Sequence, residues 1–134
     1  MEEACATLDD MPVCNQVEFH PYLNQSKLFA AATRLGIALS AYCPLAKGKI
    51  FGDPVIRSLA AKYERSEAQI ILRWIVQKGI SANPMSTKPE NLRANLEALN
   101  FTLSAPDSAT IDRLGEKGLR IVDKDRMPIA PEWD

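Results

Sequence analysis

Three segments of the chain could do chemistry, because in each of them polar side chains directly follow a β-prone run. They comprise residues 14–23, 39–47 and 80–88. In proteins built from parallel strands, functional groups lie where the strands end and their loops begin. Each segment is therefore a candidate part of a binding or catalytic site.

The first segment contains the only histidine of the chain. His20 could act as a general base, with Tyr22 two residues later as the acid. Side chains alternate along a strand, which predicts that Gln16 and Glu18 share one face and that Val17 lies on the other. Gln16 is thus a candidate for contacting a ligand, with the satisfaction of buried backbone groups as the alternative role.

The second and third segments offer an aromatic ring and a phosphate site. Tyr42, at a predicted strand end, suits stacking on a planar ligand, although a core tyrosine is the alternative interpretation. Cys43 is a poor nucleophile because its neighbours are apolar and no histidine adjoins it in sequence. Ser86 and Thr87 precede a predicted helix, whose free N–H groups and dipole attract anions. No glycine-rich phosphate loop or zinc-ligand spacing occurs.

The elements that would position these segments alternate between short strands and amphipathic helices. Such alternation predicts an α/β fold in which three parallel strands are joined by return helices. Both outer strands would have unpaired edges, which favours self-association. The predicted strands are 13–18, 37–42 and 80–83. Four helices are predicted at 2–8, 26–35, 89–99 and from 104 or 106 to 114. Two more lie between the second and third strands: Asp53 caps the first of them, and the second begins after Ser66 and ends at Gly79.

The composition excludes several classes of partner. A net charge of −1 gives no strong field for nucleic acid or an acidic membrane surface. No run of apolar residues is long enough for a transmembrane helix, and the first residues lack a signal-peptide core. The three cysteines are odd in number and widely spaced, as in reduced proteins. We therefore expect a cytoplasmic protein.

The three segments, in this order, resemble the last three strand-to-helix loops of the aldo-keto reductases. The similar motifs are Gln-Val-Glu-Phe-His-Pro-Tyr at 16–22, Tyr-Cys-Pro-Leu at 42–45 and Asn-Pro-Met-Ser-Thr-Lys-Pro at 83–89. The resemblance implies that residues 1–134 form a partial domain, comprising the last three strand-helix units and the C-terminal loop of a (β/α)8 TIM barrel. A complete barrel needs about 250 residues. Within the family, the chain is most similar to bacterial 2,5-diketo-gluconate reductases of the B type, which also reduce methylglyoxal.

This resemblance implies roles for the first two segments in binding NADP(H). Gln16 would hydrogen-bond the nicotinamide carboxamide, and the ring of Tyr42 would stack on the nicotinamide. The backbone of Cys43, Pro44 and Leu45 would approach the pyrophosphate, with Cys43 in the place of the usual serine. The family's catalytic histidine follows an earlier strand, so the element containing His20 is expected to be structural.

For the third segment, the resemblance implies contacts with the 2′-phosphate and adenine of NADPH. Ser86, Thr87 and Asn95 match the family pattern. Met85 and Asn91 stand where lysine and arginine are usual, so we expect weaker NADPH affinity and poorer discrimination against NADH. The resemblance also assigns Ala68 and Asn83 to the cofactor and Trp133 to the wall of the substrate site.

The family's catalytic tyrosine, lysine, aspartate and histidine belong to earlier strands and have no match here. The leading interpretation is thus the C-terminal portion of an NADP(H)-dependent reductase of small aldehydes and ketones, with little activity alone. One alternative is a non-catalytic module that binds dinucleotide or oligomerises through its open sheet edges. Another is a half that complements a separate N-terminal chain.

Overall fold

A sheet of three parallel strands lies at the centre of the computed structural model, which describes residues 1–8, 10–123, 125, 128 and 129. The strands β1 (Cys14–Glu18), β2 (Ala38–Tyr42) and β3 (Ser81–Ala82) follow one another in chain order. This confirms the predicted α/β class and parallel sheet. The third strand is shorter than predicted because only two of its residues pair with β2.

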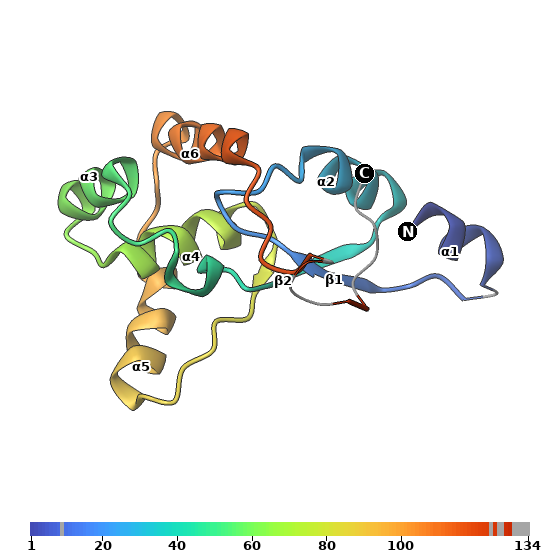
Figure 1. Cartoon of the computed structure of the whole chain (residues 1–134), viewed down its shortest axis with the longest axis horizontal. Coiled ribbons are helices and arrows are strands. Elements are labelled where there is room, and N and C mark those ends of the chain that lie inside the picture. The colour runs from blue at the N-terminus through green and yellow to red at the C-terminus, as the bar shows by residue number, and fades with distance from the viewer. Residues whose placement is uncertain (9, 124, 126–127, 130–134) are drawn as a thin grey trace.

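The described part of the chain also contains six α-helices and three short 3-10 helices (Figure 1). The helix α1 stands apart at one end of the molecule, whereas α3, α4 and α6 gather at the other. Their bounds are α1 (Glu2–Thr7), α2 (Ser26–Leu35), η1 (Ala46–Gly48), α3 (Pro54–Tyr63), α4 (Glu67–Gln77), α5 (Pro89–Glu97), η2 (Ala98–Asn100), α6 (Ala105–Asp112) and η3 (Arg113–Lys117).

Local sequence signals set the helix ends as predicted. The Asp53 carboxylate accepts hydrogen bonds from the first free N–H groups of α3, and proline follows it at the first helical position. Ser66 and Gln69 form a reciprocal capping box at the start of α4. Gly36 ends α2 in the left-handed conformation with φ of 69°, where an L side chain would be strained.

One face of the sheet forms the hydrophobic core together with the helices. Val17, Leu39 and Ala41 are buried on this face and belong to one cluster with Ile71 and Ile75 of α4. Both isoleucines are fully buried. The apolar stripe of α4 therefore closes this side of the sheet.

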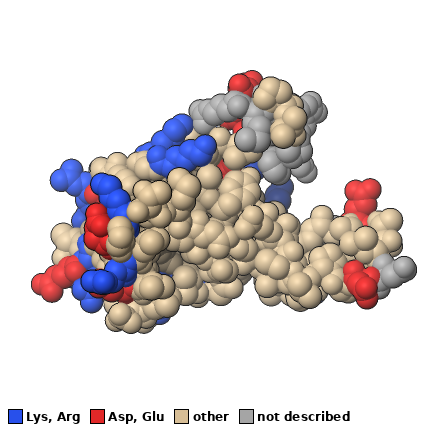
Figure 2. Space-filling model, turned by 90° about the horizontal axis from the view of Figure 1, so that it is seen from below, with Lys and Arg blue, Asp and Glu red and all other residues tan. Residues whose placement is uncertain are grey.

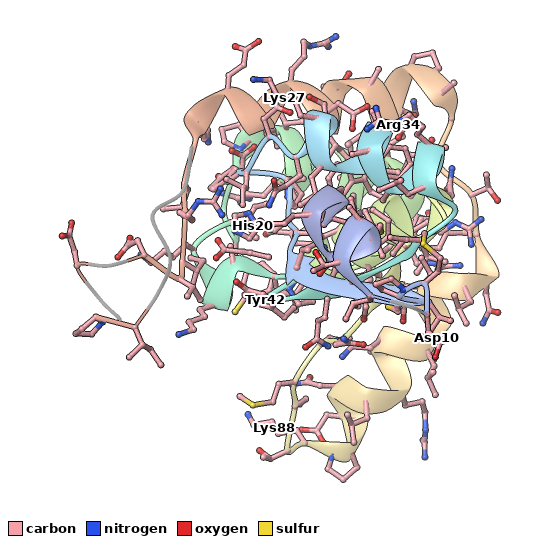
Figure 3. All side chains as sticks on the ribbon, turned by 90° about the vertical axis from the view of Figure 1, so that its right-hand side faces the viewer. Asp10, His20, Lys27, Arg34, Tyr42 and Lys88 are labelled. Atoms are coloured by element: carbon pink, nitrogen blue, oxygen red, sulfur yellow. The ribbon has the colours of Figure 1, made fainter. Side chains whose placement is uncertain are left out.

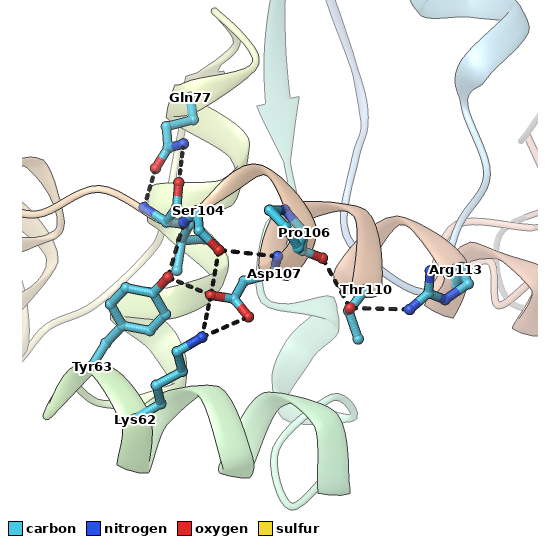
Figure 4. Close-up of polar contacts among 9 residues, drawn as sticks. Lys62, Tyr63, Gln77, Ser104, Pro106, Asp107, Thr110 and Arg113 are labelled. Atoms are coloured by element: carbon cyan, nitrogen blue, oxygen red, sulfur yellow. Dashed lines mark hydrogen bonds and ion pairs between the residues drawn. The ribbon is translucent and has the colours of Figure 1, made fainter.

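A polar network ties the outer helices together (Figure 4). The Asp107 carboxylate in the first turn of α6 accepts from Lys62 Nζ at 2.8 Å, from Ser104 Oγ at 2.6 Å and from the Tyr63 hydroxyl. Gln77 of α4 bonds the backbone N–H and C=O of Leu103. The helices α3, α4 and α6 thus form one connected layer.

No helix covers the other face of the sheet in the described part of the chain. Gln16, Ser81 and Asn83 are exposed on this open face, and Ser40 and Tyr42 are half-buried. Seen from below, the middle of the molecule carries few charges, and charged side chains gather at the end with α3 and α5 (Figure 2).

Both outer strands keep an unpaired edge among the described residues, since β1 and β3 each pair only with β2. Beside the β3 edge lies an apolar groove of about 500 Å³ between α4 and α5. Leu92, Leu96 and Leu99 line it and are 47%, 69% and 55% exposed. No described helix is long and apolar enough to cross a membrane.

Candidate functional site

The parallel register brings residues from all three strands together on the open face. Gln16 of β1 stands opposite Ser40 of β2, and Ser40 stands opposite Ser81 of β3. Asn83 donates from Nδ2 to the Ser40 hydroxyl at 2.8 Å. Tyr42 lies on the same face two residues after Ser40. The sequence-predicted residues Gln16, Tyr42 and Asn83 therefore form one group, which we call the strand-end group.

Tyr42 offers a neutral aromatic ring at the end of β2. Burial raises the pKa of its hydroxyl, and the nearby Glu18 carboxylate raises it further. His20 lies at the same end of the sheet, opposite to the end marked by Asp10 (Figure 3). A half-buried uncharged ring on an open surface is suited to stacking against a planar ligand.

The loop after β2 bends sharply next to this ring. Cys43, Ala46 and Lys47 all have positive φ, at 49°, 48° and 51°. The Ala46 N–H donates to the Cys43 carbonyl at 2.8 Å, which closes the turn. Left-handed conformations cost non-glycine residues about 1 kcal/mol or more and cluster at ligand-binding sites. Pro44 is buried and Leu45 half-buried.

The thiol of Cys43 is not arranged as a nucleophile. Burial raises its pKa against the smaller opposite effect of Lys47, so it stays protonated near neutral pH. Among the described residues, no group of three histidine, cysteine, aspartate or glutamate side chains could hold a metal ion.

The third predicted segment lies apart from the strand-end group, at the start of α5. Met85 is 93% exposed, and Ser86 Oγ accepts from the Lys88 N–H at 3.2 Å. Lys88 lies below the sheet, away from Tyr42 (Figure 3). No described side chain caps α5. Its first turn still offers few free N–H groups, because Pro89 has none and the Asn91 N–H donates to the Lys88 carbonyl at 3.1 Å. Asn91 is exposed there.

The remaining predicted residues fall into three places. Asn95 is half-buried and lines the apolar groove beside β3. Ala68 lies in the first turn of α4, next to Gln69, which donates to the Ala94 carbonyl of α5 at 3.0 Å. Trp133 lies outside the described residues.

His20 and Tyr22 do not form an acid-base pair. His20 is fully buried, and its Nε2 atom lies 3.1 Å from the Glu18 carboxylate. The Tyr22 hydroxyl donates instead to Asp53 at 2.7 Å. Both side chains serve interior contacts, as the structural interpretation of this element expects.

Sequence reasoning missed the role of Glu18. Alternation predicts the same face for Glu18 as for Gln16. Gln16 is exposed, yet Glu18 is 2% exposed because residues near Ile121 cover it. The backbone N–H of Ile121 donates to the Glu18 carboxylate at 2.6 Å. This contact joins positions 103 residues apart, and no local pattern could have revealed it.

Known proteins resemble this chain in both sequence and arrangement. The sequence profile described as the aldo/keto reductase family matches residues 1–116. Methylglyoxal reductase DkgB of Escherichia coli O157:H7 is 42% identical over 135 residues, which span all of this chain and 49% of that protein. The chain thus spans about half the length of this relative.

Two solved structures match the fold. A protein described as a 2,5-diketo-D-gluconic acid reductase B is 34% identical with a TM-score of 0.91, over 99% of this chain and 47% of that one. A mutant of Gox0644 in complex with NADPH is 31% identical with a TM-score of 0.86, over 94% of this chain and 46% of that one. The three strands and their helices therefore correspond to part of a TIM-barrel reductase, and the chain belongs to the aldo/keto reductase family.

Proposed function

We propose that residues 1–134 are one partial reductase domain that binds the nicotinamide cofactor of an NADP(H)-dependent aldo-keto reductase. The observation that carries this proposal is the register of the sheet, which aligns Gln16 with Ser40 and sets Tyr42 on the same open face. An amide and an aromatic ring side by side can bind a carboxamide and stack on its ring. The NADPH complex of a relative that matches 94% of this chain supports the same choice of ligand.

The chain's own residues fit the nicotinamide end of the cofactor. In this proposal the Gln16 amide holds the carboxamide, the Tyr42 ring covers one face of the nicotinamide, and the backbone from Cys43 to Leu45 lies along the pyrophosphate. Asn83, hydrogen-bonded to Ser40, offers its side-chain carbonyl as a further acceptor. When bound, NADPH supplies the hydride for the reduction.

The fit is poorer at the 2′-phosphate end. Ser86 and Thr87 offer hydroxyl donors to an anion at the positive end of the α5 dipole. Met85 and Asn91 contribute no charge, and Glu90 in the same turn repels a phosphate. We propose that NADPH binds weakly and that NADH competes with it, with Lys88 or Arg93 as the replacement cation.

The groups that protonate the product are not supplied by the described residues. Tyr22 and Tyr63 donate their hydroxyl protons to Asp53 and Asp107, and Tyr42 faces the cofactor in this proposal. Hydride transfer to a carbonyl carbon produces an alkoxide, which needs an acid within hydrogen-bonding distance. We therefore propose that the whole enzyme reduces small aldehydes and ketones to alcohols, and that this chain alone turns over little.

The substrate class follows from relatives rather than from the described site. Methylglyoxal reductase and 2,5-diketo-gluconic acid reductase are the printed functions of two relatives, so we propose small dicarbonyl compounds. Trp133 remains the proposed wall of the substrate site. Cys5, Cys14 and Cys43 are all unpaired, which supports a cytoplasmic location.

A cofactor titration tests the proposal. The fluorescence of reduced nicotinamide is the appropriate signal, because Trp74 is buried and stacked on Phe19 with ring centroids 5.4 Å apart. We expect saturable binding of NADPH and NADH with similar dissociation constants. The variant Tyr42→Ala should weaken both, and the exposed Ser58→Ala on α3 is the control. No binding to a folded sample would refute the proposal, and a strong NADPH preference would refute its weak phosphate site.

Two other functions have specific support. The exposed leucines beside the unpaired β3 edge favour an oligomerising half-barrel, which analytical ultracentrifugation would detect. The open face of the sheet, and the engagement of the Tyr22 and Tyr63 hydroxyls with Asp53 and Asp107, favour pairing with an N-terminal half that would supply the acid. Co-expression with the first half of a methylglyoxal reductase should then yield a complex with NADPH-dependent reductase activity.

A further inference from the structure

The chain segment after α6 returns to the sheet and crosses the end of β2 (Figure 1). We call residues 115–122 the C-terminal strap. It begins at Gly115, where an added Cβ would lie 3.3 Å from Asn24 backbone and side-chain atoms. Further along, the Leu119 N–H donates to the Tyr22 carbonyl at 2.8 Å. The strap thus follows the loop after β1.

An ion pair between a half-exposed lysine and a buried aspartate makes the first attachment of the strap. Lys117 Nζ lies 2.7 Å from Asp53 Oδ2 and 3.9 Å from the centroid of the Tyr22 ring. The lysine side chain is 49% exposed. The Asp53 carboxylate is 3% exposed, and water screens only the lysine end of the pair. This attachment holds the strap at Lys117 and does not reach its last residues.

Glu18 makes a second, buried attachment. One of its carboxylate oxygens accepts from the Ile121 N–H at 2.6 Å, and the other accepts from the Val122 N–H at 2.9 Å. His20 Nε2 lies 3.1 Å from the first oxygen. A carboxylate only accepts hydrogen bonds, so His20 donates through Nε2. The carboxylate therefore has three donors, two of which belong to the strap.

The carboxylate and the strap depend on each other. A buried charge is costly unless hydrogen bonds compensate it. Burial raises the pKa of Glu18, but the hydrogen bonds from His20 and from the two backbone N–H groups outweigh burial and lower it. His20 Nδ1 is buried without a hydrogen-bond partner among the described residues, so the contact with Glu18 is the side chain's one polar interaction there.

We propose that Glu18, oriented by His20, is the positioning residue that fixes the C-terminal strap beside Tyr42. Glu18 pairs with Tyr42 in the register of the sheet, so the strap is held at the end of the strand that carries the aromatic ring. The chain after Val122 then leaves from a fixed point at the rim of the open face. The anchoring is independent of any ligand, whereas its effect on cofactor binding rests on the function proposed above.

Hydrogen–deuterium exchange of the unliganded chain tests the anchoring. The variant Glu18→Gln keeps the side-chain shape, but its NH2 group cannot accept from a backbone N–H. We expect exchange of the Ile121 and Val122 amides to accelerate by about tenfold or more, with the Ile75 amide of α4 unchanged. The exposed Glu116→Gln on the strap is the charge-matched control. Unchanged strap exchange in Glu18→Gln would overturn the proposal, as would equal acceleration at Ile75.

If Glu18→Gln does not fold, a second pair of variants tests the same hydrogen bonds by changing the strap instead of the carboxylate. Val122→Pro removes one donated N–H, and Val122→Ala keeps it. The proposal expects faster exchange at Ile121 in Val122→Pro only, and equal exchange in both variants would contradict it.

Cofactor binding separates this proposal from the proposed function. If the native chain binds NADPH, Glu18→Gln should raise the dissociation constant by about threefold or more while Glu116→Gln leaves it unchanged. Equal affinity would refute the effect on the cofactor site. Failure of the native chain to bind would count against the proposed function alone, because the exchange test needs no cofactor.

Discussion

The two faces of the sheet differ in how completely the chain covers them. On the helix-covered face, Val17, Leu39 and Ala41 are 9%, 5% and 0% exposed. On the open face, Gln16 and Asn83 remain accessible. The chain thus contains its own core on the first face. The second face carries the candidate cofactor residues and is left for a ligand or further protein to cover. Stability and proposed function therefore depend on different sides of one sheet.

The two edges of the sheet also differ in how well the chain covers them. Near β1, the C-terminal strap buries Glu18 and His20 with hydrogen bonds. Near β3, Leu96 and Leu99 stay exposed beside the strand edge. Polar contacts from the strap cover the end of the first strand, although its backbone edge stays unpaired among the described residues. The second edge instead has an apolar surface of the kind found at interfaces.

Truncation in the helix-covered core should have the largest effect. Ile75 is fully buried against the sheet, so Ile75→Ala should lower the free energy of unfolding by about 3 kcal/mol. The matched change on the open face, Gln16→Ala, should alter it by less than about 0.5 kcal/mol. Urea unfolding followed by circular dichroism measures both. Equal losses of unfolding free energy in the two variants would contradict the conclusion that only the helix-covered face stabilises the chain.

Removal of the buried Asp53 carboxylate should have the second-largest effect on stability. Its carboxylate caps α3 and accepts from Tyr22 and Lys117, so Asp53→Ala should lower the free energy of unfolding by about 2 kcal/mol near pH 7. The exposed Asp125 serves for the control change Asp125→Ala.

The same aspartate gives a pH dependence. Burial raises the pKa of Asp53, but hydrogen bonds from Lys117, Tyr22 and the α3 amides outweigh burial and lower it. A lowered folded-state pKa means that the stabilisation is complete above the unfolded value of about 3.9 and disappears as pH falls through the folded value. The stabilities of the native chain and Asp53→Ala should therefore converge in acid, and a constant difference would contradict this account.

Removal of the ring from the open face should affect binding more than stability. Tyr42→Ala should raise the dissociation constant for NADPH by about fivefold, since ring stacking contributes about 1 kcal/mol. Fluorescence titration measures this change beside the Ser58→Ala control. A variant that binds as tightly as the native chain would exclude Tyr42 from the cofactor site.

A cation in place of Met85 should strengthen binding of the 2′-phosphate of NADPH. Met85 is almost fully exposed before α5, so Met85→Lys should not disturb the core. We expect affinity for NADPH to rise by about three- to fivefold, as for an exposed ion pair, while affinity for NADH stays the same. A parallel gain for both cofactors would show that the lysine does not meet the 2′-phosphate.

The smallest effect on stability should come from the exposed groove. Leu96→Lys should change the free energy of unfolding by less than about 0.5 kcal/mol, because Leu96 is 69% exposed. If the native chain self-associates through the β3 edge, the variant should shift it to monomer in sedimentation velocity. If Leu96→Lys still self-associates, the interface does not include Leu96.

Local sequence determined the elements of this protein. The sequence alone predicted the caps at Asp53 and Ser66, the helix end at Gly36, and the alternation of strands with amphipathic helices. Each of these features depends on neighbours within about four residues. The parallel three-strand sheet and the family followed from the order of these elements and their loop motifs. The lengths of the strands were less certain, because pairing with a neighbour decides where a strand ends.

Only the tertiary structure decided which surfaces these elements share. It grouped Gln16, Tyr42 and Asn83 and set the start of α5 apart from them. It also buried Glu18 under a segment about one hundred residues later, whereas alternation alone predicted only that Glu18 shares a face with Gln16. The physical reason is that helix caps and strand propensity are local properties. Burial depends instead on which distant segment packs against a residue, and a periodic pattern does not contain that information.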